Sequence, residues 1–94
     1  MRSVRTAAFR KFYRDLAPEV RRAARAAFRQ WQADSDHPGL NFKEVRGRKG
    51  IYSCRIGLEH RALCRKEPDR WVWAWIGPHD EYDLLLRGKN RITF

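Results

Sequence analysis

The chain has 94 residues, of which 43% are hydrophobic and 13% aromatic, and its formal net charge at pH 7 is +10. This composition excludes an intrinsically disordered chain, and no apolar run approaches the ~18 residues that a membrane-spanning helix needs. The basic N-terminus lacks the apolar segment of a secretory signal peptide. We therefore expect a single cytoplasmic domain over residues 1–94, with no structure assigned to the tail 87–94.

The positive charge is concentrated in the first two-thirds of the chain. Residues 1–66 carry 17 Lys and Arg against six Asp and Glu, whereas residues 67–94 carry four against five. Arg greatly outnumbers Lys, and its planar guanidinium suits bidentate contacts with phosphate or carboxylate. This distribution favours a polyanion or an acidic protein as partner, the alternative being a basic surface that is merely solvated.

The first third of the sequence predicts a short strand and a helical hairpin. Alternation over residues 2–6 predicts an edge strand, and apolar residues from Ala7 to Leu16 follow the spacing of a helix. Pro18 ends that helix and suits the first turn of the next, whose apolar stripe continues to Trp31. Four arginines lie on the opposite, solvent-facing side of this second helix: Arg21, Arg22, Arg25 and Arg29.

The rest of the chain predicts strands. A breaker cluster over residues 34–39 is followed by strand patterns over residues 40–45, 51–58, 61–66 and 71–76, the last apolar on both faces and therefore central in the sheet. Residues 79–86 predict at most one helical turn. The expected fold is α+β, with the N-terminal helical hairpin packed on one face of a four- to five-stranded antiparallel sheet. The other face is expected to stay partly open.

The alternation of side chains places two arginines together on the open face. If Tyr52 and Cys54 point to the helices, then Arg55 points away, and Arg61 lies across the hairpin beside it. Like charges at this distance are tolerated where an anion bridges them, or where both side chains extend into solvent. The pattern leaves both alternatives open.

The cysteines and histidines do not indicate a metal or cofactor site. Cys54 and Cys64 share the buried face, where two reduced thiols are expected rather than a disulfide. The histidines His37, His60 and His79 lack metal-ligand spacing. His79 follows the last predicted strand at the rim of the sheet, where it is either structural or a carrier of protons near neutral pH.

Four segments in order resemble the RelE/ParE superfamily of bacterial type II toxins. They span residues 9–86 and read FRKFYRDLAPEVRRAARAAFRQW, HPGLNFKEVRG, IYSCRIGLEHRAL and WVWAWIGPHDEYDLLL. The resemblance implies the fold expected above and, for RelE-like members, a growth-arresting endoribonuclease (mRNA interferase) that cleaves mRNA on the ribosome without metal. In that reaction a ribose 2′-hydroxyl attacks the adjacent phosphate. The family's catalytic positions fall on Arg55, Arg61, His79 and Tyr82.

The resemblance also implies partners and leaves the activity open. The expected partners are a cognate acidic antitoxin, the ribosome and mRNA, with no cofactor and no membrane, and the residues expected to bind RNA are Lys43, Arg46, Arg48, Lys49 and Arg65. Two departures weigh against catalysis: His60 stands where the family often has Tyr, and Ser53 replaces a lysine of some ribonuclease members. The alternatives are a gyrase poison of the ParE type and a degenerate relative that only binds.

Overall fold

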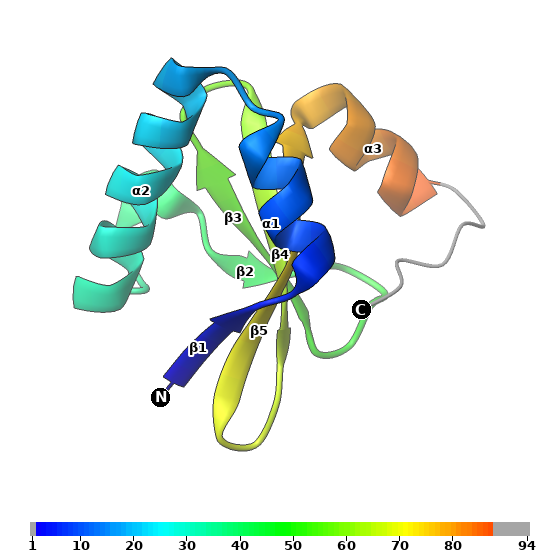
Figure 1. Cartoon of the computed structure of the whole chain (residues 1–94). Helices are drawn as coiled ribbons and strands as arrows, with labels where there is room; N and C mark the ends of the chain where they lie inside the picture. The colour runs from blue at the N-terminus through cyan, green and yellow to red at the C-terminus, as the bar shows by residue number, and fades with distance from the viewer. Residues whose placement is uncertain (1, 88–94) are drawn as a thin grey trace.

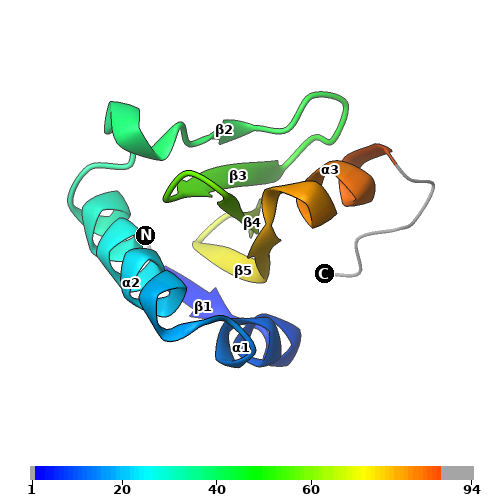
Figure 2. The ribbon, with the colours of Figure 1, turned by 90° about the horizontal axis from the view of Figure 1, so that it is seen from above.

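The structure is a computed structural model that describes residues 2–87; most of the expected tail, residues 88–94, lies outside this range. A sheet of five strands carries two helices on one side and a third on the other (Figures 1 and 2). The elements in chain order are β1 (Arg2–Arg5), α1 (Ala7–Arg14), α2 (Pro18–Ala33), the 3₁₀ helix η1 (Pro38–Leu40), β2 (Lys43–Glu44), β3 (Ile51–Ile56), β4 (His60–Lys66), β5 (Arg70–Pro78) and α3 (His79–Arg87).

The sheet has the order β1-β5-β4-β3-β2, which confirms the α+β fold with a helical hairpin. Strands β2 to β5 form the expected antiparallel meander, and β5 is interior because it pairs with both β4 and β1. Two details differ from expectation. Strand β1 pairs with β5 in parallel, so the sheet is mixed. The strand expected over residues 40–45 is reduced to β2, because the chain forms η1 and then passes through a left-handed residue, Asn41 (φ 45°).

Local hydrogen bonds fix the helical hairpin. The Thr6 hydroxyl caps α1 by accepting from the backbone N–H of Phe9 at 3.0 Å, and Pro18 lies in the first turn of α2. The Arg21 guanidinium donates to the carbonyl of Leu16, and the Arg25 guanidinium donates to the Tyr13 hydroxyl at 2.7 Å. These contacts hold the short connection between α1 and α2. No helix within residues 2–87 is long and apolar enough to cross a membrane.

The main core lies between the helical hairpin and the sheet. Trp31 of α2 packs edge-to-face on Trp73 of β5, with ring centroids 5.2 Å apart, and on Phe42 at 5.7 Å. Cys54 and Ala62 lie on this same face, as the alternation predicts. The core therefore fixes which residues of β3 and β4 point away from the helices.

The opposite face is partly covered by α3. The expected single helical turn is instead a nine-residue helix, because Tyr82, Leu85 and Leu86 recur at helical spacing and pack on Leu63 and Trp75 of the sheet. A register shift between β4 and β5 at Leu63 allows Trp75 to face α3, although Trp73 faces the main core. Leu63 points to this face of the sheet and is 0% exposed, because α3 covers it.

Candidate active site and nucleic-acid interface

The paired strands β3 and β4 hold two arginines side by side. Arg55 lies directly opposite Arg61 in the register, as the alternation predicts, and both side chains are partly exposed. Arg55 donates from Nε to the carbonyl of Gly57 at 3.1 Å, and Arg61 donates from Nη1 to the carbonyl of His60 at 2.7 Å. Within residues 2–87, neither guanidinium forms an ion pair with a carboxylate. The remaining N–H groups of both arginines are therefore available to an anion.

His79 is fixed at the junction of β5 and α3. Its backbone N–H donates to the carbonyl of Glu59 at 2.7 Å, which joins the start of α3 to the β3–β4 turn. Its imidazole Nδ1 lies 3.2 Å from Oδ2 of Asp83, one turn later on the helix. Because Asp83 lies against Nδ1, Nε2 is the ring nitrogen left to exchange a proton with a bound group. Asp83 was not expected as a site residue, because the segment was not predicted to continue as a helix beyond one turn.

A cavity of about 580 Å³ lies between the β3–β4 turn and the start of α3, and we call it the β4–α3 cavity. It brings Arg61 and His79 together, whereas Arg55 and Tyr82 are not among the residues that line it. The complete lining is Leu58, Glu59, His60, Arg61, Pro78, His79 and Asp80. A cation and an imidazole that line one cavity are the groups that a phosphate transfer reaction uses.

Tyr82 contributes to packing beside this cavity. Its ring lies 6.4 Å from that of Trp75 and 6.0 Å from the imidazole of His79, measured between centroids. The side chain is partly buried in the cluster that holds α3 on the sheet. Tyr82 therefore neighbours His79, and its role in chemistry stays a prediction.

The five residues expected to bind RNA fall into two groups. Lys43 pairs with Ser53 across β2 and β3, so its exposed side chain lies on the same face as Arg55 and one step along the sheet. The other four lie at the end of β3 and β4 away from Arg55, where the backbone N–H of Lys66 donates to the carbonyl of Gly50. In the register, Lys43 lies opposite Ser53 and Arg65 opposite Ile51, so about 7 Å along β3 separates the two groups, at ~3.3 Å per residue.

Two of these four residues are engaged within the protein. Arg48 donates from Nη2 to the carbonyls of Leu85 and Leu86 at 3.4 and 3.5 Å, where it meets the last turn of α3. Arg65 donates from Nη2 to Oε2 of Glu67 at 2.6 Å. Arg46 and Lys49 are exposed in the β2–β3 loop and lack an ion-pair partner among the described residues.

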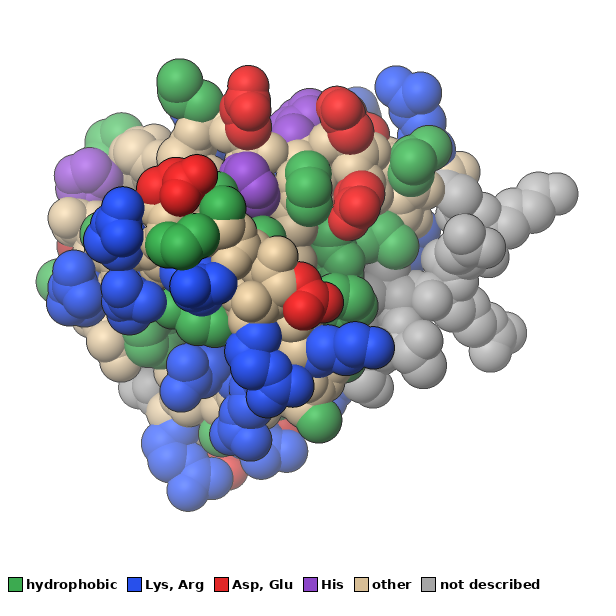
Figure 3. All heavy atoms as spheres, turned by 45° about the horizontal axis from the view of Figure 1, so that its top comes forward, with side chains coloured by type: hydrophobic (Ala, Val, Ile, Leu, Met, Phe, Trp, Pro, Cys, Tyr) green, Lys and Arg blue, Asp and Glu red, His purple; other side chains and the backbone are tan. Residues whose placement is uncertain are grey.

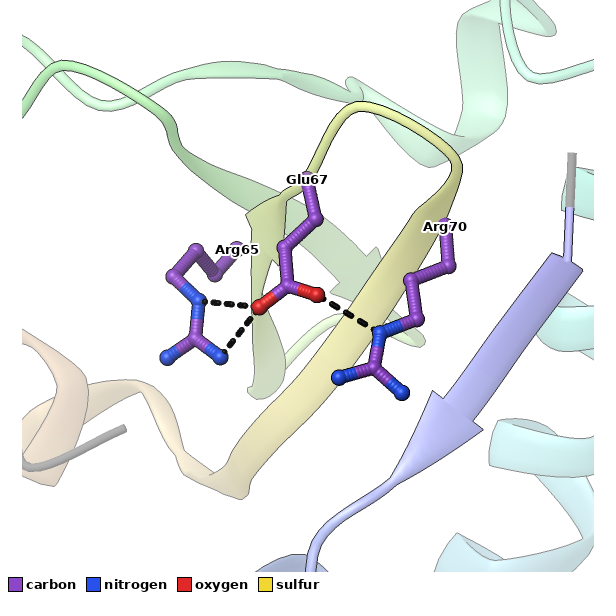
Figure 4. Close-up of polar contacts among 3 residues, drawn as sticks. All are labelled: Arg65, Glu67 and Arg70. Carbon is purple, nitrogen blue, oxygen red and sulfur yellow. Dashed lines mark hydrogen bonds and ion pairs between the residues drawn. The ribbon is translucent and has the colours of Figure 1, made fainter.

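Glu67 joins two arginines at the β4–β5 turn (Figure 4). Its second carboxylate oxygen accepts from Nε of Arg70 at 2.6 Å. The hydrogen bonds from Arg70 and Arg65 lower the pKa of Glu67, and the bond to Glu67 raises the pKa of Arg70. This cluster stabilises the turn. The sequence pattern does not predict it, although the charges of Arg65, Glu67 and Arg70 alternate in sign.

The surface charge is segregated. Basic side chains gather over the left and lower parts of the face in Figure 3, where α2 and α1 lie, and acidic side chains stand at the upper right, over α3. The first turn of α3 contains Asp80 and Glu81, followed by Asp83. The β4–α3 cavity therefore lies where the basic sheet end meets an acidic helix.

The two cysteines are buried and free. Cys54 lies opposite Ala62 and Cys64 opposite Tyr52, so the thiols are diagonal neighbours on one face rather than directly opposed. Burial raises the pKa of Cys54 to about 12 and also raises the pKa of Cys64. Neither thiol is a nucleophile near neutral pH. Within residues 2–87, no three His, Cys, Asp or Glu side chains are grouped as metal ligands would be.

The sequence of residues 18–83 matches the family model of the ParE-like toxin domain. A comparison with curated proteins finds no match.

Several solved structures share the fold. The chain is similar to a RelB–RelE antitoxin–toxin complex from Methanococcus jannaschii (TM-score 0.69, 16% identity, covering 85% of this chain and 95% of that one). It is also similar to a YoeB/ParE toxin from Agrobacterium tumefaciens, with a TM-score of 0.66 and 19% identity, covering 84% of this chain and 99% of that one. A third similar structure is the RelE–RelB complex from Pyrococcus horikoshii OT3, with a TM-score of 0.64 and 12% identity, covering 83% of this chain and 93% of that one.

Proposed function

Because this chain belongs to the ParE-like toxin domain family, whose members are toxins of toxin–antitoxin systems, we propose that it is an endoribonuclease that cleaves mRNA on the ribosome. The observation that carries the proposal is the pair of arginines, Arg55 and Arg61, placed next to an imidazole. Arg61 and His79 line the same cavity, and Arg55 lies beside Arg61 in the register. A toxin that only binds its target does not need this combination.

The geometry supports a metal-free cleavage of a phosphodiester. His79, with Nδ1 facing Asp83, takes the proton of the ribose 2′-hydroxyl at Nε2. The guanidiniums of Arg61 and Arg55 stabilise the negative charge that develops on the phosphate oxygens. Removing one such electrostatic donor typically lowers kcat by about 10²–10³-fold.

The proposed partner is an acidic antitoxin, and the proposed location is the cytoplasm, where ribosomes are. The similar structure from Methanococcus jannaschii is of an antitoxin–toxin complex. In the present chain, α2 exposes Arg22, Arg25 and Arg29, which suit an acidic segment that folds on binding.

The test is induced expression followed by mapping of transcript ends by primer extension. We expect the native chain to arrest growth and to produce new 5′ ends within translated mRNA. His79→Ala should abolish both, because the phosphate reaction loses its proton acceptor. His37→Asn is the matched control, since His37 only caps η1, by accepting from the N–H of Gly39 at 3.1 Å. Undiminished toxicity of a folded His79→Ala chain would contradict the proposal.

A second candidate function is inhibition of DNA gyrase, which the ParE-like family description favours. This activity requires no proton transfer, so His79→Ala would remain toxic. Induction would then raise markers of DNA damage while the transcripts stay intact. A chain that does not slow growth at all would instead be a relative that only binds.

A further inference from the structure

Another cavity, of about 320 Å³, lies between the helical hairpin and the sheet, and we call it the hairpin cavity. Three small residues help to line it: Ala24 of α2 and, directly opposite each other in the register, Cys54 of β3 and Ala62 of β4. Protein interiors are close-packed and leave few voids larger than a water molecule, whereas a volume of this size is typical of ligand pockets. The hairpin cavity is therefore large enough to hold a small organic molecule.

The walls of the hairpin cavity are mostly apolar and in part aromatic. Trp31 and Trp73 meet edge-to-face, with ring centroids 5.2 Å apart, and Phe28 stacks on Trp31 at 5.7 Å. All three side chains line the cavity, and such walls favour a planar aromatic guest. An engineered cavity of ~150 Å³ holds one benzene molecule, so a cavity about twice as large suits a body of two rings.

Three arginines line the hairpin cavity where it reaches the surface. Arg25 and Arg29 are four residues apart and therefore neighbours on α2, and Arg5 is the last residue of β1. All three side chains are exposed, and within residues 2–87 none of them forms an ion pair. The hydrogen bond from Arg25 to the Tyr13 hydroxyl, 2.7 Å long, holds one of these guanidiniums at the mouth. The mouth of an apolar cavity thus carries positive charge that is not neutralised.

A smaller cavity, of about 230 Å³, extends this basic mouth along α1. It shares Arg5, Phe9 and Tyr13 with the hairpin cavity and adds Arg10 and Arg14. Among the described residues, no Asp or Glu lines either cavity. An anion bound at the mouth would therefore meet guanidiniums and a hydroxyl without repulsion from a lining carboxylate.

We propose that the hairpin cavity binds a small aromatic oxyanion, that is, a carboxylate or a phosphate monoester with a body of two rings. The rings lie against the aromatic walls, and the acid group is bound by the three arginines, whose forked donors match its oxygens. A peptide segment fits the interior less well, because each residue brings an N–H and a C=O that apolar walls cannot pair. The hairpin cavity shares no lining residue with the β4–α3 cavity, so the proposal stands whichever target the toxin acts on.

The experiment titrates the protein with naphthoate, naphthyl phosphate and the neutral naphthamide, and it follows the indole N–H signals by NMR. We expect saturable shifts for Trp31 and Trp73 but none for Trp75, which packs on the α3 side of the sheet. Naphthamide should bind about tenfold or more weakly than the better anion, because it lacks the charge that the arginines bind. The tighter of the two anions identifies the acid group. Absence of these shifts with both anions, or equal binding of the amide, would overturn the proposal.

Variants test whether the anion occupies this cavity. Ala24→Leu fills part of the space and should abolish binding, whereas Ala26→Leu, at an exposed position of the same helix, should keep it. Arg29→Gln should weaken binding about tenfold, the effect of losing one charge-assisted hydrogen bond. Lys11→Gln removes an exposed charge that lines neither cavity and should have no such effect. If Ala24→Leu does not fold, the amide and Arg29→Gln still decide the outcome. An anion that binds native protein and folded Ala24→Leu equally well lies elsewhere on the basic surface, and the proposal is then wrong.

Discussion

At the scale of single residues, the site depends on which charges find a partner inside the protein. Arg65 and Arg70 both bind Glu67, whereas Arg55 and Arg61 bind only backbone carbonyls among the described residues. A guanidinium held by a carboxylate attracts a phosphate less than one held by a carbonyl, because its charge is already neutralised. Internal pairing, rather than the number of arginines, therefore separates the candidate site from the rest of the basic surface.

Glu67 gives a prediction about pH. Its pKa in the folded protein is lowered from the ordinary value of 4.5, so its stabilising effect is complete above that pH and is lost as the pH falls through the lowered pKa. We expect Glu67→Gln to lower the Tm at pH 7 by a small amount, because the pair is solvent-screened. The difference from the native protein should vanish in acid, as measured by calorimetry. Glu59→Gln, at a carboxylate without an ion pair among the described residues, should show no such trend.

At the scale of elements, α3 is held by a small apolar cluster of its own. Leu63, Trp75 and Val45 form the buried part, and Arg48 from the β2–β3 loop bonds to the last turn of the helix. Because His79 is the first residue of α3, the position of its imidazole depends on this packing. The element that presents the proposed base is therefore anchored independently of the main core.

Truncating a side chain at the centre of this apolar cluster should lower the free energy of unfolding. Leu63→Ala removes a fully buried side chain, and such changes typically lower the free energy of unfolding by about 2–5 kcal/mol. Leu84→Ala, at a position 66% exposed on the same helix as His79, should change it by less than about 0.5 kcal/mol. Denaturant unfolding checks both values, and equal effects of the two changes would show that α3 is not anchored at Leu63.

The sequence predicts well those features that depend on local periodicity. The period of two in residues 51–58 and 61–66 is enough to place Arg55 opposite Arg61, and the helical spacing up to Trp31 is enough to define α2. It does not reveal the parallel pairing of β1, since a strand carries no mark of its distant partner. Asp83 was missed because residues 79–86 predict at most one helical turn, whereas the chain forms a nine-residue helix directly after β5.

At the scale of the whole molecule, the net charge of +10 is divided between surfaces that face different ways. The helical hairpin and the β2–β3 loop are basic, and α3 is acidic. Binding to ribosomal RNA would use the basic surfaces, and counterion release makes such binding sensitive to salt.

The role of the β2–β3 loop can be tested through this salt dependence. Replacing Arg46 and Lys49 by Gln should reduce the slope of log Kd against log salt for ribosome binding by about one for each phosphate that the loop no longer neutralises. Arg65→Gln serves as the comparison, because its guanidinium is already bound to Glu67 at 2.6 Å. We expect that single change to alter the slope by less than about one. An unchanged slope in the double variant would show that the β2–β3 loop does not contact RNA in the interface.

The parallel pairing of β1 with β5 has a consequence for how the molecule is made. Arg2 pairs with Arg70, and the junction that carries His79 follows directly after β5. Contacts between such distant segments form late, because the intervening chain must be ordered first. A nascent chain that ends before β5 has no partner for β1, and it also lacks the wall of the cavity that holds the proposed base. The proposed site therefore cannot form until both β5 and the start of α3 have been synthesised.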